Sequence, residues 1–369
     1  MRRLVIALLF LAACSNGGSL HAVATSASPS SSAISPSPSS VAVTPRVLPN
    51  RSDVLAVIAG PKNSSLSLVG SDGVVIATTP VDLKPFQANA LMSWTSPSQT
   101  REYYLNGGSE VRFLTADGRT AQATKIALGA SEQAGFAVSP DDRRIAVAVF
   151  SYTLPANQSG SPPTYDGMRL YVEDVQGGGH HVDIHSSTTV AEFPIGWTGG
   201  QLVMAVVNPL CCRALPINPY AATSYHVVDP ATGRRLASLC ENSAGPEGPI
   251  EPAGAICLEG SSSPRFQRWD GSLFAAPAAV PNPTYLVALS PDGTRVAVGG
   301  DRIRLMGPAG RADQLLSESG YALGWLDAGH IVFERLDNSG LSAFDLNASI
   351  SADLGAYSAY LGTFPTPLV

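Results

Sequence analysis

The side chains best suited to chemistry lie between residues 180 and 257. His181, Asp183 and His185 occur at every second position, so on a strand they would point the same way and could supply three zinc ligands. The same alternation is typical of an outer strand with one solvent-exposed edge, and this is the interpretation that we favour. We therefore expect no metal site and no cofactor.

Four cysteines, Cys211, Cys212, Cys240 and Cys257, lie in the same stretch. No Cys-x-x-Cys spacing supports a metal site, whereas cysteines of an exported chain favour disulfides. Three connectivities are possible for two bonds. We expect one member of the adjacent pair to bond with Cys240 and the other to bond with Cys257.

Sequence motifs of catalysis are not found. The chain has neither a Gly-x-Ser-x-Gly nucleophile elbow nor a Ser-x-Asp-x-Gly-x-x-Trp box. The segment 229–233 (Asp-Pro-Ala-Thr-Gly) is similar to a turn of quinone-cofactor propellers, but it occurs once and lacks the tryptophan that follows there. We interpret it as a hairpin turn and assign no catalytic residue.

The N-terminus has the pattern of a targeting signal. Arg2 and Arg3 precede an apolar run from Leu4 to Leu11, and Leu-Ala-Ala-Cys ends at Cys14. This resembles a bacterial lipoprotein signal with its lipobox, which implies a signal peptide over 1–13 and a lipid on Cys14. The apolar run is about half the roughly 20 residues that span a membrane, so a transmembrane helix is not expected.

The amino-acid composition differs between the N-terminal region and the rest of the chain, which predicts a linker followed by a folded domain. Residues 14–50 are dominated by Ser, Pro, Ala and Thr, so we predict a lipidated, disordered linker before a domain over 51–369. Charged residues make up only 14% of the chain, against about 25% in an average globular protein. The net charge of −6 gives no basic field for a phosphate backbone, so nucleic acid is not an expected partner.

The folded part contains a repeated hairpin. Residues 285–300 (YLVALSPDGTRVAVGG) and 136–149 (FAVSPDDRRIAVAV) each place Ser-Pro-Asp between two apolar runs. Short strands continue in seven groups over about 310 residues, close to the 40 to 45 residues of a propeller blade. The groups span 54–78, 90–126, 136–185, 192–239, 255–275, 286–316 and 322–354. We predict an all-β, seven-bladed propeller, with six or eight blades as alternatives.

These hairpins resemble the WD-like repeats of TolB-type bacterial propellers. Gly-Trp-Thr-Gly-Gly at 196–200 and Gly-Trp-Leu-Asp-Ala-Gly at 324–329 are degenerate versions. The first group lacks an innermost strand, and 357–364 (YSAYLGTF) has no blade of its own. We therefore predict that the C-terminal segment pairs inside the N-terminal blade and closes the ring.

Three long insertions, at 151–167, 208–224 and 241–254, fall on one face by strand order. They carry four candidate binding residues, Tyr152, Tyr165, Arg213 and Tyr220. The sequence thus predicts a monomeric, lipid-anchored extracytoplasmic module of the cell envelope that binds a protein or an envelope polymer through this face. The alternative is a propeller hydrolase or lyase that acts on glycans or small esters around the central channel.

Overall fold

The computed structural model describes ten segments of the chain, which together contain all the strands discussed below. They are 54–83, 94–153, 164–207, 222–241, 251–258, 264–274, 287–307, 312–337, 339–357 and 359–365. The chain divides into two units, 1–45 and 46–369, and every described residue belongs to the second. Within these segments no helix has the length and apolar character needed to cross a membrane.

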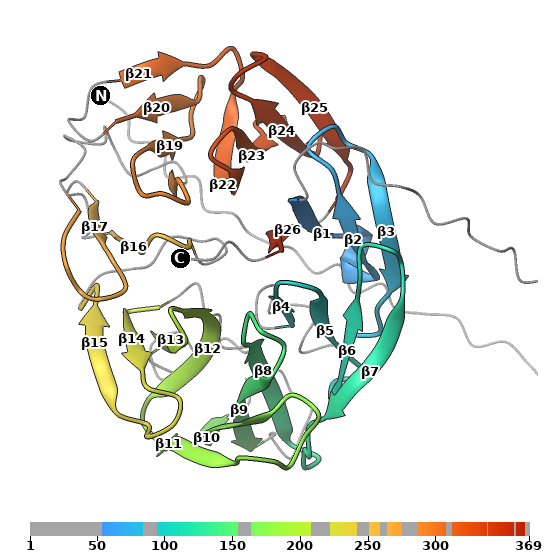
Figure 1. Cartoon of the computed structure of the whole chain (residues 1–369), viewed down its shortest axis with the longest axis vertical. Helices are drawn as coiled ribbons and strands as arrows, with labels where there is room; N and C mark the ends of the chain where they lie inside the picture. Colours follow the sequence, from blue (N-terminus) through green and yellow to red (C-terminus); the bar gives the residue numbers. More distant parts are fainter. Residues whose placement is uncertain are drawn as a thin grey trace, which may run out of the picture. The chain divides into compact units, whose positions relative to one another are not determined.

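The described residues form six four-stranded antiparallel sheets and one two-stranded sheet, numbered here as blades 1 to 7 (Figure 1). Blade 1 contains β26 (Ala359–Phe364), β1 (Leu55–Ala59), β2 (Ser65–Val69) and β3 (Val75–Pro80). Blade 2 contains β4 (Thr95–Pro97), β5 (Glu102–Asn106), β6 (Glu110–Leu114) and β7 (Thr120–Lys125). Blade 3 contains β8 (Glu132–Val138), β9 (Arg144–Thr153), β10 (Thr164–Asp174) and β11 (Val182–Ser187).

The second half of the chain repeats this arrangement. Blade 4 contains β12 (Ala191–Thr198), β13 (Gln201–Val207), β14 (Ser224–Val228) and β15 (Arg235–Leu239). Blade 5 has β16 (Ala255–Cys257) and β17 (Arg265–Gln267). Blade 6 contains β18 (Val287–Leu289), β19 (Val296–Val298), β20 (Arg304–Met306) and β21 (Ala312–Leu315). Blade 7 contains β22 (Gly320–Asp327), β23 (His330–Arg335), β24 (Leu341–Asp345) and β25 (Ile350–Gly355).

The seven sheets follow one another around a ring, and each coincides with one of the seven predicted groups (Figure 1). Innermost strands of successive blades contact each other, from β26 through β4 and β8 to β12, and again from β18 through β22 to β26. Blade 5 is joined to its neighbours by two core clusters, one containing Trp269 and Tyr225, the other containing Phe266 and Val287. The seven-bladed propeller is confirmed.

The ring closes by pairing the two ends of the domain. β26 lies antiparallel to β1, with Leu55 opposite Phe364 and Ala59 opposite Ala359. The C-terminal segment therefore provides the innermost strand of the N-terminal blade, as predicted. Because a closed ring has no unpaired gap between its first and last blades, this pairing holds together all seven blades.

The Ser-Pro-Asp hairpins are the predicted inner hairpins of blades 3 and 6. In blade 3 the amide of Ser139 donates to the carbonyl of Arg144 at 2.9 Å, and in blade 6 Ser290 donates to Arg295 at 2.8 Å. Each turn needs one left-handed residue, which is Asp142 (φ 60°) in the first and Gly293 (φ 69°) in the second. The Asp and Gly of the repeat thus serve the turn.

The two Gly-Trp motifs have a defined structural role that the sequence did not reveal. The indole N–H of Trp197, in blade 4, donates to the carbonyl of Ala137 in blade 3 at 3.2 Å. Trp325, in blade 7, donates in the same way to Ala288 in blade 6 at 3.1 Å. Each acceptor lies two residues before the serine of a Ser-Pro-Asp hairpin, so each Gly-Trp motif joins its blade to the hairpin of the preceding one.

Candidate binding site on the third blade

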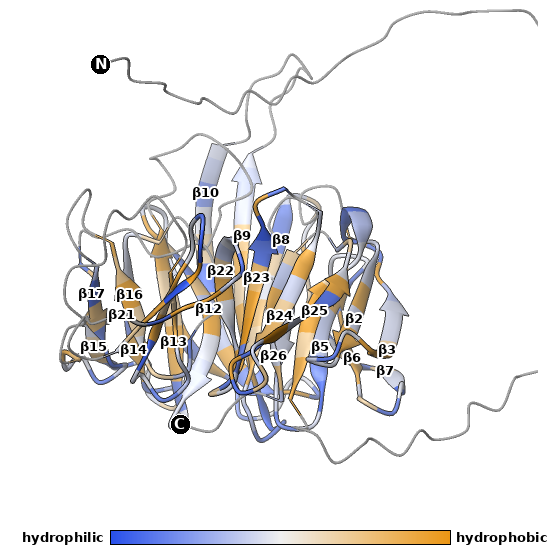
Figure 2. Cartoon of the chain, turned by 90° about the horizontal axis from the view of Figure 1, so that it is seen from above, coloured by the Kyte–Doolittle hydropathy of each residue, from blue (hydrophilic) through white to orange (hydrophobic). Residues whose placement is uncertain are grey.

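The hairpin of β9 and β10 is the element that departs most from the repeat. Its strands are 10 and 11 residues long and stay paired from Arg144 opposite Asp174 to Thr153 opposite Thr164. β11 covers only Met168–Val172 of β10. The last residues of β9 and the first residues of β10 therefore extend beyond β11, and Figure 2 shows these two strand ends projecting from the blade.

An open depression of about 700 Å³ lies at the foot of this extension. Its walls are Ser151 of β9, the segment 166–169 of β10, and the segment 186–189 at the end of β11. Five hydroxyl side chains line it, and the exposed carboxylate of Asp166 lies among them. The site is thus suited to a polar ligand that both donates and accepts hydrogen bonds.

Tyr165 fixes the hairpin against the chain that enters blade 4. Its hydroxyl donates to the carbonyl of Val190 at 3.0 Å and lies 3.3 Å from that of Ser187. Burial, followed by the nearby charge of Glu192, raises the pKa of Tyr165, so the hydroxyl stays protonated and keeps its role as a donor. Tyr165, one of the four predicted residues, therefore holds the hairpin in place from the side of blade 4 and is not among the residues that line the depression.

Tyr152 does not lie where the sequence predicted. It pairs with Tyr165 across the hairpin, is 5% exposed, and packs in the core with its ring 6.2 Å from that of Tyr165. The segment 151–167 was expected to be a loop, but its ends continue β9 and begin β10, and the alternation turns Tyr152 towards blade 4. As a correction, Tyr152 supports the hairpin and cannot present its ring to a partner.

Two charged side chains line the depression, Arg169 and Asp166. Arg169 contacts both carboxylate oxygens of Glu132, at 2.6 and 3.3 Å, and Glu132 also accepts from the amide of Gly129 at 2.7 Å. The hydrogen bond from Arg169 holds the pKa of Glu132 below its usual value. Asp166 accepts a hydrogen bond of 2.7 Å from Thr153 and has no cation beside it among the described residues. Because Glu132 offsets the charge of Arg169, Asp166 is the charge of the depression that is left without a salt bridge among the described residues.

A buried acid and base lie beneath this region, between blades 3 and 4. Glu192, 5% exposed, contacts Nδ1 of His226 at 3.0 Å, and His226 is 8% exposed. Burial alone would raise the pKa of Glu192, but the hydrogen bond and charge of His226 lower it. Neither residue belongs to a sequence motif, since they lie on β12 and β14 and meet only through the register of blade 4.

The His181, Asp183 and His185 set does not share one face. His181 contacts Asp183 at 3.2 Å and Glu173 at 3.3 Å, but the register shifts at Ile184, so Asp183 lies opposite Tyr171 whereas His185 lies opposite Leu170. This bulge reverses the alternation and turns His185 to the other face, which corrects the prediction. In the described segments no three His, Cys, Asp or Glu side chains are arranged to hold a metal ion.

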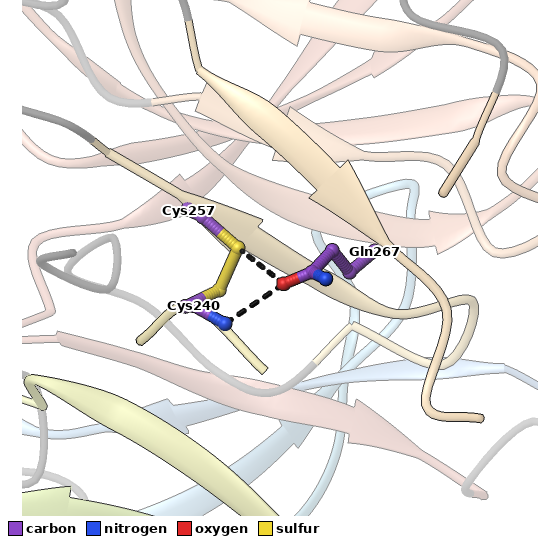
Figure 3. Close-up of a disulfide and its surroundings, with 3 residues drawn as sticks. All are labelled: Cys240, Cys257 and Gln267. Carbon is purple, nitrogen blue, oxygen red and sulfur yellow. Dashed lines mark hydrogen bonds between the residues drawn. A yellow bond between two sulfur atoms is a disulfide. The ribbon is translucent and has the colours of Figure 1, made fainter. Parts of the chain in front are cut away.

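The cysteine pairing also differs from the preferred prediction. Cys240 and Cys257 bond with each other, with their Cα atoms 4.9 Å apart, so neither is available to Cys211 or Cys212 (Figure 3). Gln267 supports the bridge, because its Oε1 accepts from the amide of Cys240 at 2.8 Å and lies 3.3 Å from the sulfur of Cys257. The bond joins the end of β15 to β16, and therefore blade 4 to blade 5.

The remaining predicted site residues lie outside the described segments. They are the candidate binding residues Arg213 and Tyr220, the predicted lipidation site Cys14, and Cys211 and Cys212. The turn at 229–233 is described, and it is the hairpin turn that the sequence predicted: Asp229 accepts from the amide of Ala231 and from the hydroxyl of Thr232, both at 2.9 Å.

Comparison with known proteins gives no family for this chain. No protein-family model matches the chain, and no curated protein matches it. Among solved structures, TolB from Acinetobacter baumannii has 11% identity and a TM-score of 0.38, and the match covers 85% of this chain and 65% of TolB. BamB from Moraxella catarrhalis has 12% identity and a TM-score of 0.38, with 79% and 88% covered.

An enzyme structure matches to a similar degree. Dihydro-heme d1 dehydrogenase NirN has 12% identity and a TM-score of 0.42, and the match covers 84% of this chain and 75% of NirN. Such low similarity concerns the fold alone, because propellers of one architecture carry unrelated activities. The function of this chain must therefore be argued from its own residues.

Proposed function

We propose that this chain is a lipid-anchored, extracytoplasmic binding module of the bacterial cell envelope. The observation that carries the proposal is the hairpin of β9 and β10, which extends past β11 and borders an open, hydroxyl-lined depression. Such a rigid extension on a closed ring offers a preformed surface to a partner. Its contacts with Val190 and Ser187 hold it in place before any partner arrives.

Two further features support an extracytoplasmic location. The Cys240–Cys257 bond is of a kind that persists in oxidising compartments. The lipobox at Cys14 would tether the domain to the membrane, with the Ser/Pro-rich linker of residues 15–50 between lipid and propeller. The anchor rests on sequence alone, and replacement of Cys14 by Ser tests it: the variant should leave the detergent phase, whereas unchanged partitioning would contradict the anchor.

Site-specific photo-crosslinking in intact envelopes tests the binding role. A photoreactive residue replaces Thr164, which is exposed at the start of β10, or Arg119, which is exposed in the turn between β6 and β7. We expect a discrete adduct from position 164 and none from position 119, because strand order places these two positions at opposite ends of their blades. Equal adduct patterns from the two positions, or no adduct at 164, would contradict the proposed face.

A further inference from the structure

The outer edge of β10 is open at its first residues. β11 begins to pair with β10 only at Met168, whereas β10 starts at Thr164, so no described strand covers the outer side of Thr164, Tyr165 and Asp166. An open strand edge presents main-chain donors and acceptors that another strand can use. This edge borders the depression described above.

The register shows which main-chain groups face outwards. The amide of Tyr152 donates to the carbonyl of Ser131 at 3.0 Å, so the main chain of Tyr152 points towards β8. Tyr165 is the residue opposite Tyr152, and in an antiparallel pair of this kind both residues point their main-chain groups away from each other. The N–H and C=O of Tyr165 therefore point to the open side.

The edge is held rigidly, which lowers the entropic cost of pairing. The hydroxyl of Tyr165 is fixed by Val190 and Ser187, and Thr153 donates to Asp166 at 2.7 Å across the hairpin. The bulge at Asp166 places a carboxylate next to the edge, while the nearby charge of Arg169 is already neutralised by Glu132. One carboxylate, that of Asp166, therefore lies next to the edge without a salt bridge among the described residues.

We propose that this edge binds an extended peptide segment of a partner protein, which adds to β10 as a further strand at Tyr165 and places a basic side chain beside Asp166. The inference rests on the proposed binding role and specifies its ligand. The hydroxyl groups of Ser186, Thr188 and Thr189 would meet polar groups of the same segment in the depression. Strand addition of this kind takes its affinity from main-chain hydrogen bonds and its specificity from alternate side chains.

Two other occupants fit the surface less well. A second copy of this chain, paired edge to edge, would bring its own Asp166 next to the first, and like charges at an interface are unfavourable. A glycan would be expected to stack on an aromatic ring, but no aromatic side chain lines the depression within the described segments. The peptide therefore matches both the main-chain groups and the charge.

The test uses the full chain in detergent and a phage-displayed library of random linear peptides. The tightest peptide is synthesised as a series in which each amide in turn is N-methylated. Because Tyr165 is the residue whose main-chain groups face the open side, we expect binding to fall about tenfold or more when the peptide amide that meets its carbonyl is methylated, and to change little at the amides on either side. Uniform sensitivity, or uniform tolerance, along the peptide would overturn strand addition.

Variants of the chain locate the site. We expect Asp166→Lys to weaken a basic peptide by about tenfold or more, because the attraction becomes repulsion. Thr188→Trp should block the depression, whereas Thr120→Trp, at another exposed position, on the outer strand of blade 2, should not affect binding. Binding that is unchanged by Thr188→Trp, or a library that yields no binding peptide, would overturn the inference. If position 164 gives adducts in envelopes but the library yields no binding peptide, the proposed binding role is supported and the proposed peptide ligand is contradicted.

Discussion

The hydroxyl of Tyr165 donates a hydrogen bond of 3.0 Å to the carbonyl oxygen of Val190. This bond joins the projecting part of blade 3 to the segment that leads into blade 4. It therefore fixes the open edge of β10 and one side of the depression at the same time.

Replacement of Tyr165 by Phe keeps the ring and removes this donor. We expect the free energy of unfolding to fall by about 1 kcal/mol, since one partly buried hydrogen bond is lost. Amide exchange in the hairpin should also accelerate relative to the other blades. Urea unfolding and hydrogen exchange measure the two effects, and unchanged exchange in 164–169 would show that the hydroxyl does not hold the hairpin.

Replacement of Trp197 or Trp325 by Phe tests the contacts between neighbouring blades. Each variant loses an indole donor to the preceding blade, and Trp325 also loses part of its contact with Arg295, whose guanidinium carbon lies 5.4 Å from the ring centroid. We expect both to destabilise the domain by about 1 to 3 kcal/mol, with the larger effect at Trp325. Thermal unfolding of the two variants that matched the parent protein would exclude this role.

The Cys240–Cys257 bond closes a loop with a sequence separation of 17. Replacement of both cysteines by serine should lower the free energy of unfolding by about 3 kcal/mol, the amount expected for a loop of this size. Peptide mapping without reduction should recover the two cysteines in one linked pair. Recovery of Cys240 linked to Cys211 or Cys212 would support the sequence-based pairing instead.

Glu102 is a buried carboxylate at a core position of the repeat. In blade 2, Glu102 is the first residue after the inner hairpin turn. The equivalent positions are Ile145 in blade 3 and Val296 in blade 6, which are both apolar. Glu102 is 0% exposed, and within the described structure neither carboxylate oxygen has a hydrogen-bond partner. Burial raises the pKa of Glu102 well above its usual value.

This raised pKa has a definite consequence for stability. An acid that is harder to ionise in the folded state favours folding below its unfolded pKa, and that contribution is lost as pH rises towards the folded pKa. We therefore expect Glu102→Val to stabilise the domain at neutral pH by about 1 to 3 kcal/mol and to flatten the decline in stability above about pH 4. Denaturation at several pH values measures this, and a destabilised variant at neutral pH would indicate that Glu102 has a partner.

Much of the fold could be predicted because its signals are local. Ser139 and Ser290 each begin a turn whose residues are adjacent in sequence. The apolar segment at 357–364 could be assigned to blade 1 because the first predicted group lacked an innermost strand. The misplacements of Tyr152 and His185 have a different origin. Whether Tyr152 faces solvent depends on how far the hairpin continues, and the face of His185 depends on one extra residue at Ile184.

The contacts of the candidate site could not be predicted for a related reason. Glu192 and His226 meet only because two strands of blade 4 adopt one register, and the open edge at Tyr165 exists because β11 ends early. Neither circumstance leaves a pattern of spacing in the sequence. Pairing between cysteines likewise depends on the meeting of β15 and β16.

Residue-specific amide exchange at Tyr165 shows whether the edge of β10 is open and binds a strand. In the free protein the amide of Tyr165 should exchange much faster than that of Tyr152, which donates to Ser131. Addition of the selected peptide should slow exchange at Tyr165 and leave Tyr152 unchanged. A Tyr165 amide that is already protected in the free protein, or that stays unprotected when the peptide is bound, would contradict an open edge that binds by strand addition.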